Sequence, residues 1–451
     1  MMAGAHSFKV EFSRRADHMV GRVTGDTHVR LDEYALSVNL FRRIPHLAGD
    51  LLRLGLAAYA ADRLARRNWQ RVAGGSRVMD LTLGVAEPDF WRDDSITGLV
   101  RDALQLLSGD QWHVCFTPAQ ADPDYLGSRT EQHPSVCLYS GGLDSAAGLA
   151  TRLRVCREPV LAVTAWHQAR QRQRTLKQLR RLASRYGTDV SPIVVRTACV
   201  NPPSFREQEL TQRCRSFLFA ALAGAVACAE GSSVVEMYEN GVGVINLPLM
   251  HGMATGARTT KSSHPRFVRL MTDLVSRVAE RRIDYLLPHR SRTKADIVRT
   301  LHEDSLSDVA LETVSCVHYP LRRKAKQCGY CPACIGRRQA LIVAGIQEPE
   351  GLYECDLFGP SEITNSIDPA KLMGIKATLM HVDRLADLRR RFLPDWFLQY
   401  ASGTGVENSV AALDSWVDVL LRFRSEWLKL VEFGQSKGWK WAGWLPVSSA
   451  A

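Results

Sequence analysis

One segment limits the possible folds of this chain more than any other. Residues 135–153 read SVCLYSGGLDSAAGLATRL, in which an apolar run enters a serine- and glycine-rich loop and a helix-like stretch follows. Glycine lets the backbone turn tightly and approach a ligand closely, and the N–H groups at the start of a helix point into the loop. A strand–loop–helix unit of this kind is typical of parallel sheets, in which ligands bind at the carboxyl ends of the strands.

The segment around this loop alternates between strands and helices. The strand-like runs PVLAVTAW, SPIVVRTA and SVVEMY are separated by the helical stretches RTLKQLRRLASRYG and RCRSFLFAALAGAVACAEG. Continuous apolar strands that alternate with helices indicate a parallel sheet covered on both faces. We therefore expect an α/β fold, with a catalytic domain over residues 131–345.

Two further regions flank this domain. Residues 1–130 combine a helical stretch with the alternating runs RVMDLTLGV and QWHVCFTP, which predicts an N-terminal α+β domain. Residues 346–451 open with a turn-rich linker and continue as a C-terminal helical region. One helix face there has apolar residues at helical spacing and predicts a stripe that packs into a core: Trp416, Leu420, Phe423, Trp427 and Leu430. The tryptophan-rich end of the chain leaves a base-stacking role open.

The composition limits the classes of protein to consider. Of 451 residues, 45% are hydrophobic and 23% are charged, as in globular proteins with a large core. The formal net charge is +11, but the arginines are spread along the chain, so nucleic acid is a possible partner that we do not favour. The first residues, MMAGAHSFKVEF, lack the apolar stretch of a signal peptide. We therefore expect a soluble, cytoplasmic protein that does not use a membrane.

The glycine loop has the composition of a phosphate-binding site. The serines at its two ends offer hydroxyl donors, and the aspartate can hold Mg²⁺ or a water molecule on it. No Gly-Lys-Ser or Gly-Lys-Thr follows, so the loop is not of the Walker type. We predict that the loop binds the pyrophosphate part of a nucleotide. Its residues are Ser140, Gly141, Gly142, Leu143, Asp144 and Ser145.

Four of the eleven cysteines are crowded into one short stretch. They follow the spacing C-x11-C-x2-C-x2-C and are Cys316, Cys328, Cys331 and Cys334. Short spacings let neighbouring thiolates reach one ion, and four thiolates close a tetrahedral Zn²⁺ site, so we expect a structural zinc. An iron–sulfur cluster also accepts four cysteines and remains an alternative. His318 can replace one cysteine as a ligand, but we expect it to be a hydrogen-bonding neighbour of the site.

Together, the loop and the cysteines resemble a known family. Ser-Gly-Gly-x-Asp-Ser is similar to the PP-loop of ATP pyrophosphatases, and a PP-loop followed by this cysteine pattern resembles 7-cyano-7-deazaguanine synthase, QueC. The run AWHQARQRQRTLKQLRRLA is similar to the second strand and following helix of QueC. The run SRTKADIV is similar to its Thr-Lys-Ala-Glu-Ile segment, with Asp296 in place of glutamate. The resemblance covers residues 133–345 and implies a HUP-like core that carries the PP-loop.

The resemblance also implies a reaction. QueC uses ATP to adenylate the carboxylate of 7-carboxy-7-deazaguanine, ammonia converts the adenylate to an amide, and a second ATP drives dehydration to the nitrile. For this chain it implies ATP, Mg²⁺ and Zn²⁺ as cofactors, with Asp144, Ser145 and Lys294 as catalytic residues. Arg213 or Arg215 are further candidates for neutralising phosphate charge. The candidate substrate residues are Glu239, Asn240 and Gly241, which follow a strand, Thr293 beside Lys294, and His264, Arg266 and Phe267, which loosely resemble a substrate-binding segment of QueC.

The chain adds about 130 residues before this core and about 100 after it. This enlarged architecture resembles the QueC-like proteins of bacterial anti-phage operons, QatC and the QueC-like component of type IV CBASS. That resemblance implies a ligase that transfers the activated deazaguanine acid to the N-terminal amine of an acceptor protein from the same operon, which the flanking regions bind. Two alternatives remain open: a free 7-cyano-7-deazaguanine synthase in queuosine biosynthesis, and a tRNA-modifying PP-loop enzyme.

Overall fold

The strands and helices belong to two units, and each unit is assembled from several stretches of the chain. Unit 1 comprises Met1–Ser140, Arg157–Met237 and Thr255–Leu287, and unit 2 comprises Gly141–Cys156, Tyr238–Ala254 and Pro288–Ala451. The computed structural model describes residues 5–15, 18–23, 27–31, 44–67, 76–120, 135–166, 169–200, 209, 211–247, 260–318, 327–359, 367–389, 392–402 and 404–445. The units do not follow the three segments expected from the sequence, 1–130, 131–345 and 346–451, whose boundaries stay a prediction.

Unit 1 is built around one sheet. In chain order its strands are β1 (His6–Arg15), β2 (His18–Val23), β3 (Thr27–Leu31), β4 (Val78–Val85), β5 (Gln111–Pro118), β6 (Ser135–Leu138), β7 (Val160–Trp166), β8 (Val190–Val200), β9 (Val234–Met237) and β10 (Asp284–Leu286). The ten strands lie in the order β10-β9-β6-β7-β8-β3-β2-β1-β4-β5. The four strands predicted around the glycine loop are confirmed as β6 to β9, whereas β10 was not predicted.

The five strands from β10 to β8 form the predicted parallel sheet. β6 pairs with β7 and β9, β7 also pairs with β8, and β9 also pairs with β10, all in parallel. Every residue of 160–165 in β7 is buried, as expected for an apolar strand covered on both faces. The order in which the chain adds strands reverses at β6 and β9, and ligands of such sheets bind beyond the carboxyl ends of the strands at the reversal.

The N-terminal strands extend the same sheet instead of forming a separate one. β3 lies antiparallel to β8, with Val29 opposite Cys199 and Leu31 opposite Thr197. Beyond β3 the sheet continues through antiparallel β2 and β1 to β4 and β5, which are parallel to β1. β4 and β5 confirm the two strands predicted from alternating runs. The pairing of β3 with β8 joins distant parts of the chain, so no local pattern reveals it.

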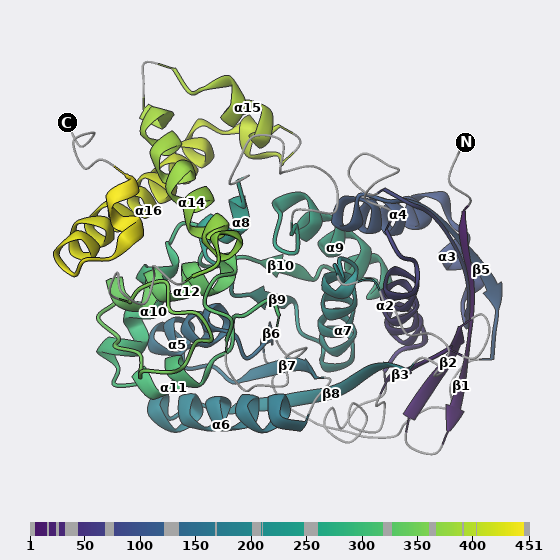
Figure 1. Cartoon of the computed structure of the whole chain (residues 1–451). Coiled ribbons are helices and arrows are strands. Elements are labelled where there is room, and N and C mark those ends of the chain that lie inside the picture. The colour runs from purple at the N-terminus through teal and green to yellow at the C-terminus, as the bar shows by residue number, and fades with distance from the viewer. Residues whose placement is uncertain are drawn as a thin grey trace. The chain divides into compact units, whose positions relative to one another are not determined.

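Helices cover both faces of this sheet. They are α2 (His46–Leu64), α3 (Pro88–Arg92), α4 (Asp94–Ser108), α6 (Ala169–Tyr186), α7 (Arg215–Glu230) and α9 (Pro265–Val278). α6 runs alongside β8 on the side away from α7 (Figure 1). α2 packs closely on α7, because a Cβ atom added at Gly55 would lie 3.0 Å from the Cβ of Ala221. This contact buries most of α2, including the charged side chains of Asp50 and Asp62.

Four buried charged side chains of unit 1 form one network of ion pairs. Arg67 donates to both oxygens of Asp110 at 2.7 and 2.8 Å, and Arg77 Nη2 lies 2.6 Å from Asp62 Oδ1 and 2.5 Å from Asp110 Oδ2. These side chains are at most 3% exposed. Asp62 also accepts a hydrogen bond from the backbone N–H of Cys214 at 3.0 Å, at the start of α7. The network therefore ties α2, α7 and the starts of β4 and β5 together.

The described part of unit 2 is mostly helical. Its helices are α5 (Leu143–Val155), α8 (Gly241–Ile245), α10 (Lys294–Glu303), α11 (Ser307–Glu312), α12 (Pro332–Val343), α14 (Pro369–Arg384), α15 (Asp395–Ala401) and α16 (Val410–Ser436), with the 3-10 helices η3 (Leu385–Arg389), η4 (Val406–Asn408) and η5 (Lys440–Trp444). α5 packs against α10 and α11, and α16 packs against α8, α12 and α14.

The aromatic residues of the C-terminal region fill hydrophobic cores of unit 2. The stripe predicted on α16 is confirmed, since Trp416, Leu420 and Trp427 are buried. Near the end of the chain, Trp441 is fully buried and its ring lies 5.2 Å from that of Phe358. Packing therefore accounts for these buried aromatic residues, whereas Trp444 is 36% exposed. Among the helices that the structure describes, none combines the length and the apolar character needed to cross a membrane.

We predict that Asp110→Ala destabilises the protein by about 3–5 kcal/mol, because the change leaves two buried guanidinium groups short of a carboxylate. Asp80→Ala is the matched control in the same sheet: Asp80 pairs with His113 at 2.8 Å, but its side chain is 40% exposed. The control should lose no more than about 1 kcal/mol. Urea unfolding followed by circular dichroism compares the two variants, and equal midpoints would contradict this account.

Candidate active site

The glycine loop has the backbone geometry of an anion-binding turn. Gly141 has a φ of +74°, which glycine adopts without steric cost, and Gly142 is the N-cap of α5. The first N–H groups of any helix lack carbonyl partners within the helix and favour an anion in front of them. Ser145 Oγ donates to the carbonyl of Gly142 at 3.0 Å, while Ser140 is exposed and Leu143 is buried. The loop therefore fits the phosphate group that the sequence predicts for it.

Asp144, in the first turn of α5, is the centre of a polar cluster in unit 2. Its Oδ2 lies 2.8 Å from Lys294 Nζ, and its Oδ1 accepts a hydrogen bond from Asn240 Nδ2 at 2.8 Å. Burial opposes the charge on Lys294, but the carboxylates of Asp144 and Glu239 raise the pKa of this lysine above its ordinary value. Lys294 is therefore an ammonium at neutral pH. The structure thus brings together four residues that the sequence predicted for the site.

Glu239 is held in place by its neighbour in the chain. Its Oε1 accepts hydrogen bonds from the Nδ2 and the backbone N–H of Asn240, at 2.8 and 3.2 Å. Gly243 makes room for this carboxyl group, since a Cβ atom there would lie 2.3 Å from Glu239 Oε1. Burial, and then the charge of Asp144, raise the pKa of Glu239 to about 8, although Lys294 acts in the opposite direction. The site therefore contains a carboxyl group that exchanges a proton near neutral pH.

Three helices begin at this cluster. Asp144 lies in the first turn of α5, Asn240 is the N-cap of α8, and Lys294 is the first residue of α10. A helix start carries partial positive charge, which favours anions and disfavours a lysine unless a negative group accompanies it. Asp144 supplies one such group. The N–H groups at the start of α5 and the ammonium of Lys294 can still donate to a further anion such as a phosphate.

The C-terminal helix α16 holds the start of α10. Thr293 is the N-cap of α10: its hydroxyl accepts from the backbone N–H of Asp296 at 3.1 Å and donates to Glu426 of α16. Arg422 of α16 donates to the backbone carbonyl of Ser291 and to Asp296. The Thr293 hydroxyl is therefore engaged in positioning Lys294, although the sequence suggested a contact with substrate. The C-terminal region takes part in building the site.

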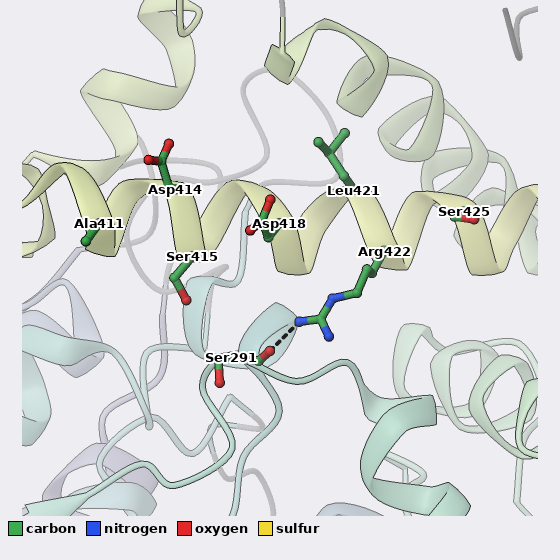
Figure 2. A pocket seen from close by; sticks show the side chains of 8 residues that line it. All are labelled: Ser291, Ala411, Asp414, Ser415, Asp418, Leu421, Arg422 and Ser425. Atoms are coloured by element: carbon green, nitrogen blue, oxygen red, sulfur yellow. Dashed lines mark hydrogen bonds between the residues drawn. The ribbon is translucent and has the colours of Figure 1, made fainter.

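An open groove of about 970 Å³ lies beside this contact. One wall is a face of α16 and the other is the loop that carries Ser291, as Figure 2 shows. The residues that line the groove are Ser291, Ala411, Asp414, Ser415, Asp418, Leu421, Arg422 and Ser425. The same loop touches the polar cluster, because the carbonyl of Arg292 accepts a hydrogen bond from the N–H of Gly241 at 2.8 Å. A groove of this size admits a ligand much larger than ammonia.

The other predicted substrate residues lie on α9 in unit 1. His264 is the N-cap of α9, and its Nδ1 accepts a hydrogen bond from the N–H of Arg266 at 3.2 Å. Burial, and then three neighbouring cations, lower the pKa of His264 to about 4, so its ring is neutral. Phe267 is fully buried in the hydrophobic core of unit 1. The structure thus assigns Phe267 to packing.

Arg213 and Arg215, the alternative phosphate-binding cations, also lie in unit 1. Arg213 donates to the hydroxyl of Thr260 at 2.9 Å. The guanidinium of Arg215 lies 4.9 Å from the centre of the Phe219 ring. Burial lowers the pKa of both arginines. Within unit 2, Lys294 is the cation that lies beside Asp144.

The four cysteines form a separate centre in unit 2. Their sulfur atoms lie within 4.8 Å of one another, and all four residues are buried. Cys328 Sγ and Cys334 Sγ are 3.8 Å apart. A tetrahedral ion with Zn–S bonds of about 2.3 Å separates its sulfurs by about 3.8 Å, so the cysteines fit zinc. A cluster of two or four irons would spread the sulfurs further, because the four cysteines would not all bind the same metal ion.

Backbone groups support this centre. The N–H groups of Cys328, Cys331 and Cys334 point at the sulfurs of Cys316, Cys328 and Cys331 at 3.3–3.4 Å, and such donors stabilise thiolates. Gly329 has a φ of +83° and no room for a Cβ atom, so this turn requires glycine.

His318 stands beside the cysteine centre. Its ring lies 5.8 Å from that of Tyr330. Within the described residues, only the four cysteines form the ligand group. The hydrogen bond expected of His318 stays a prediction.

Three side chains that shape the site were not predicted from the sequence. Arg422 and Glu426 lie on α16, far in the sequence from Lys294. The pattern of an amphipathic helix predicts which positions are polar, but not which distant residue each polar side chain contacts. His289 Nε2 donates to the carbonyl of Gly148 at 3.1 Å, and burial lowers the pKa of this histidine. One sign of this packing was present in the sequence, because Gly148 is a glycine in the middle of α5. A Cβ atom there would lie 2.4 Å from that of Tyr238.

Comparison with models of known protein families gives a match to part of the chain. Residues 255–345 match the family model described as queuosine biosynthesis protein QueC. The matched stretch contains Lys294 and the four cysteines, and Asp144 precedes it. A search of curated proteins found no match to the chain. This part of the chain is therefore QueC-like, which supports the resemblance found in the sequence.

We predict that Cys331→Ser loses about one metal ion per chain and lowers the melting temperature, because a zinc site of four thiolates contributes directly to folding. Cys115→Ser is the control, since Cys115 is exposed and lies outside the centre. Elemental analysis and thermal melts compare the two proteins. If Cys331→Ser is insoluble, treating the wild type with a chelator gives the same test, and an unchanged melting temperature in the metal-free protein would rule out a structural metal.

Proposed function

We propose that this chain is a PP-loop enzyme that uses ATP to adenylate the carboxylate of 7-carboxy-7-deazaguanine and then transfers the acyl group to an amine. The cluster of Asp144, Asn240 and Lys294 after the Ser-Gly-Gly loop carries this proposal. It combines a backbone turn for a phosphate with a fixed cation and a carboxylate. The QueC match over residues 255–345 supports the substrate class.

Each residue of the cluster has a task in this reaction. The loop and the start of α5 bind the phosphates of ATP, and the ammonium of Lys294 stabilises the negative charge that develops as pyrophosphate leaves. Asp144 orients Lys294 and offers an oxygen ligand for Mg²⁺, which would further neutralise phosphate charge. Asn240 fixes the carboxylate of Asp144 through its hydrogen bond at 2.8 Å. The four cysteines hold Zn²⁺ in a structural role.

We further propose that the amine is the N-terminus of a partner protein, within a bacterial anti-phage system. The open groove beside Ser291 supports a bulky acceptor, and Asp414 and Asp418 along its wall suit the positive charge of a peptide N-terminus. Ammonia needs no such groove, and a closed site would protect an acyl-adenylate better from water. A free 7-cyano-7-deazaguanine synthase is therefore the second candidate. The groove does not favour the third, a tRNA-modifying enzyme, because its two aspartates would repel a phosphate backbone.

We predict that Asp144→Ala and Ser145→Ala each lower the release of AMP and pyrophosphate at least about a hundredfold, because the charge that develops on the phosphates loses its preorganised partners. Coupled assays for pyrophosphate, with 7-carboxy-7-deazaguanine and an amine present, measure the loss. Asp383→Ala, at an exposed position of α14 in the same unit, is the control and should keep wild-type activity. Normal AMP release by a folded Asp144→Ala variant would refute the assignment of the loop.

The identity of the acceptor is tested with ammonium. We expect the purified protein, given ATP, Mg²⁺, 7-carboxy-7-deazaguanine and ammonium, to release AMP and to form little or no nitrile, as judged by mass spectrometry. Efficient conversion to the nitrile would establish the free synthase and overturn the protein acceptor. No consumption of ATP with this acid would refute the substrate class.

A further inference from the structure

Only one of the two carboxyl oxygens of Glu239 accepts hydrogen bonds from the described residues. Its Oε1 accepts both hydrogen bonds from Asn240, at 2.8 and 3.2 Å. In the described part of the chain no residue hydrogen-bonds its Oε2, and Glu239 as a whole is only partly buried. The polar groups around it are Asp144 of α5 and Lys294 of α10, together with Asn240 at the start of α8. One oxygen is thus fixed, and the other remains for a ligand.

We propose that Glu239 is the catalytic base that takes the proton from the attacking amine during acyl transfer. The inference rests on the proposed function. It concerns the second half of the reaction, the transfer of the acyl group from the adenylate to the amine, and assigns proton transfer in that half to Glu239. Asn240 connects the two halves, because its Nδ2 donates to Asp144 Oδ1 and to Glu239 Oε1, each at 2.8 Å. Glu239 is therefore joined through a single side chain, that of Asn240, to Asp144, the carboxylate that we assign to phosphate binding.

The step balances without any further reactant. The amine nitrogen forms a bond to the acyl carbon of the adenylate, and the bond between that carbon and the phosphate oxygen breaks, so AMP leaves with the electron pair. The nitrogen loses one proton, which passes to Glu239 Oε2 and then to water. ATP, the acid and the amine are the only substrates required.

The proton affinity of Glu239 suits this task. Burial and the charge of Asp144 raise the pKa of Glu239 to about 8. A carboxyl group whose pKa lies this close to neutrality can accept the proton of the amine and then release it to water.

The test separates the two halves of the reaction in Glu239→Gln, which keeps both the size of the side chain and an oxygen for Asn240. The first half is measured as ATP–pyrophosphate exchange that depends on 7-carboxy-7-deazaguanine. The second half is measured as formation of the hydroxamate from hydroxylamine, a weakly basic amine that does not titrate near pH 8. We expect exchange to stay within about threefold of the wild type and hydroxamate formation to fall about 10²- to 10⁴-fold.

The pH profile gives a readout that a structural role would not change. Hydroxamate formation by the wild type should rise with pH and level off above about 8, since Glu239 accepts a proton only when ionised. The profile should be flat in Glu239→Gln, and Glu239→Asp should restore the rise with a reduced rate. Glu303→Gln is the control, because Glu303 is a half-exposed partner of Arg154 at the far end of α10.

The outcomes distinguish this inference from the proposed function. Absence of exchange in the wild type would refute the proposed function itself. Exchange in the wild type but not in Glu239→Gln would place Glu239 in the first half of the reaction, for example as a ligand of Mg²⁺, and would overturn the inference. Unchanged hydroxamate formation by Glu239→Gln would overturn it as well.

Discussion

The ion pair between Asp144 and Lys294 is the interaction on which the site depends. A lysine at the first position of a helix faces the partial positive charge of that helix, and two more helices begin beside it. Asp144, at 2.8 Å, is the group that makes this arrangement stable. The pair still leaves donors for a nucleotide phosphate, namely the N–H groups at the start of α5 and the ammonium of Lys294.

The surrounding fold keeps this pair in position from two sides. Asn240 fixes one oxygen of Asp144 and links it to Glu239. Thr293 caps the helix that Lys294 begins, and Glu426 and Arg422 of α16 hold that cap and the loop before it. The C-terminal extension is therefore more than an addition to a catalytic core. It fixes the start of α10 and at the same time provides one wall of the groove that we assign to the acceptor.

Local patterns were enough to predict the parts of the structure that short segments determine. The Ser-Gly-Gly loop, the strands β6 to β9, the stripe on α16 and the cysteine centre all follow from spacing and periodicity within a few residues. The pairing of β3 with β8, the buried network of Arg77 and Asp110, and the contact of Glu426 with Thr293 could not be predicted in this way. These contacts join residues far apart in the sequence. Periodicity predicts which face of an element is buried, but it does not predict which residue a polar side chain will contact. Glu239 was predicted to lie near a ligand, but its proton affinity depends on burial and on Asp144.

The central claim is that a carboxylate attacks the α-phosphate of ATP at this site. Heavy-oxygen label in the carboxylate of 7-carboxy-7-deazaguanine tests this most directly, because an acyl-adenylate passes one of the two carboxylate oxygens to AMP when it breaks down at carbon. Mass spectrometry of AMP after a single incubation with the wild-type protein reads the transfer. The account predicts AMP with one labelled oxygen, whereas unlabelled AMP would mean that water attacks ATP and that the acid is never adenylated.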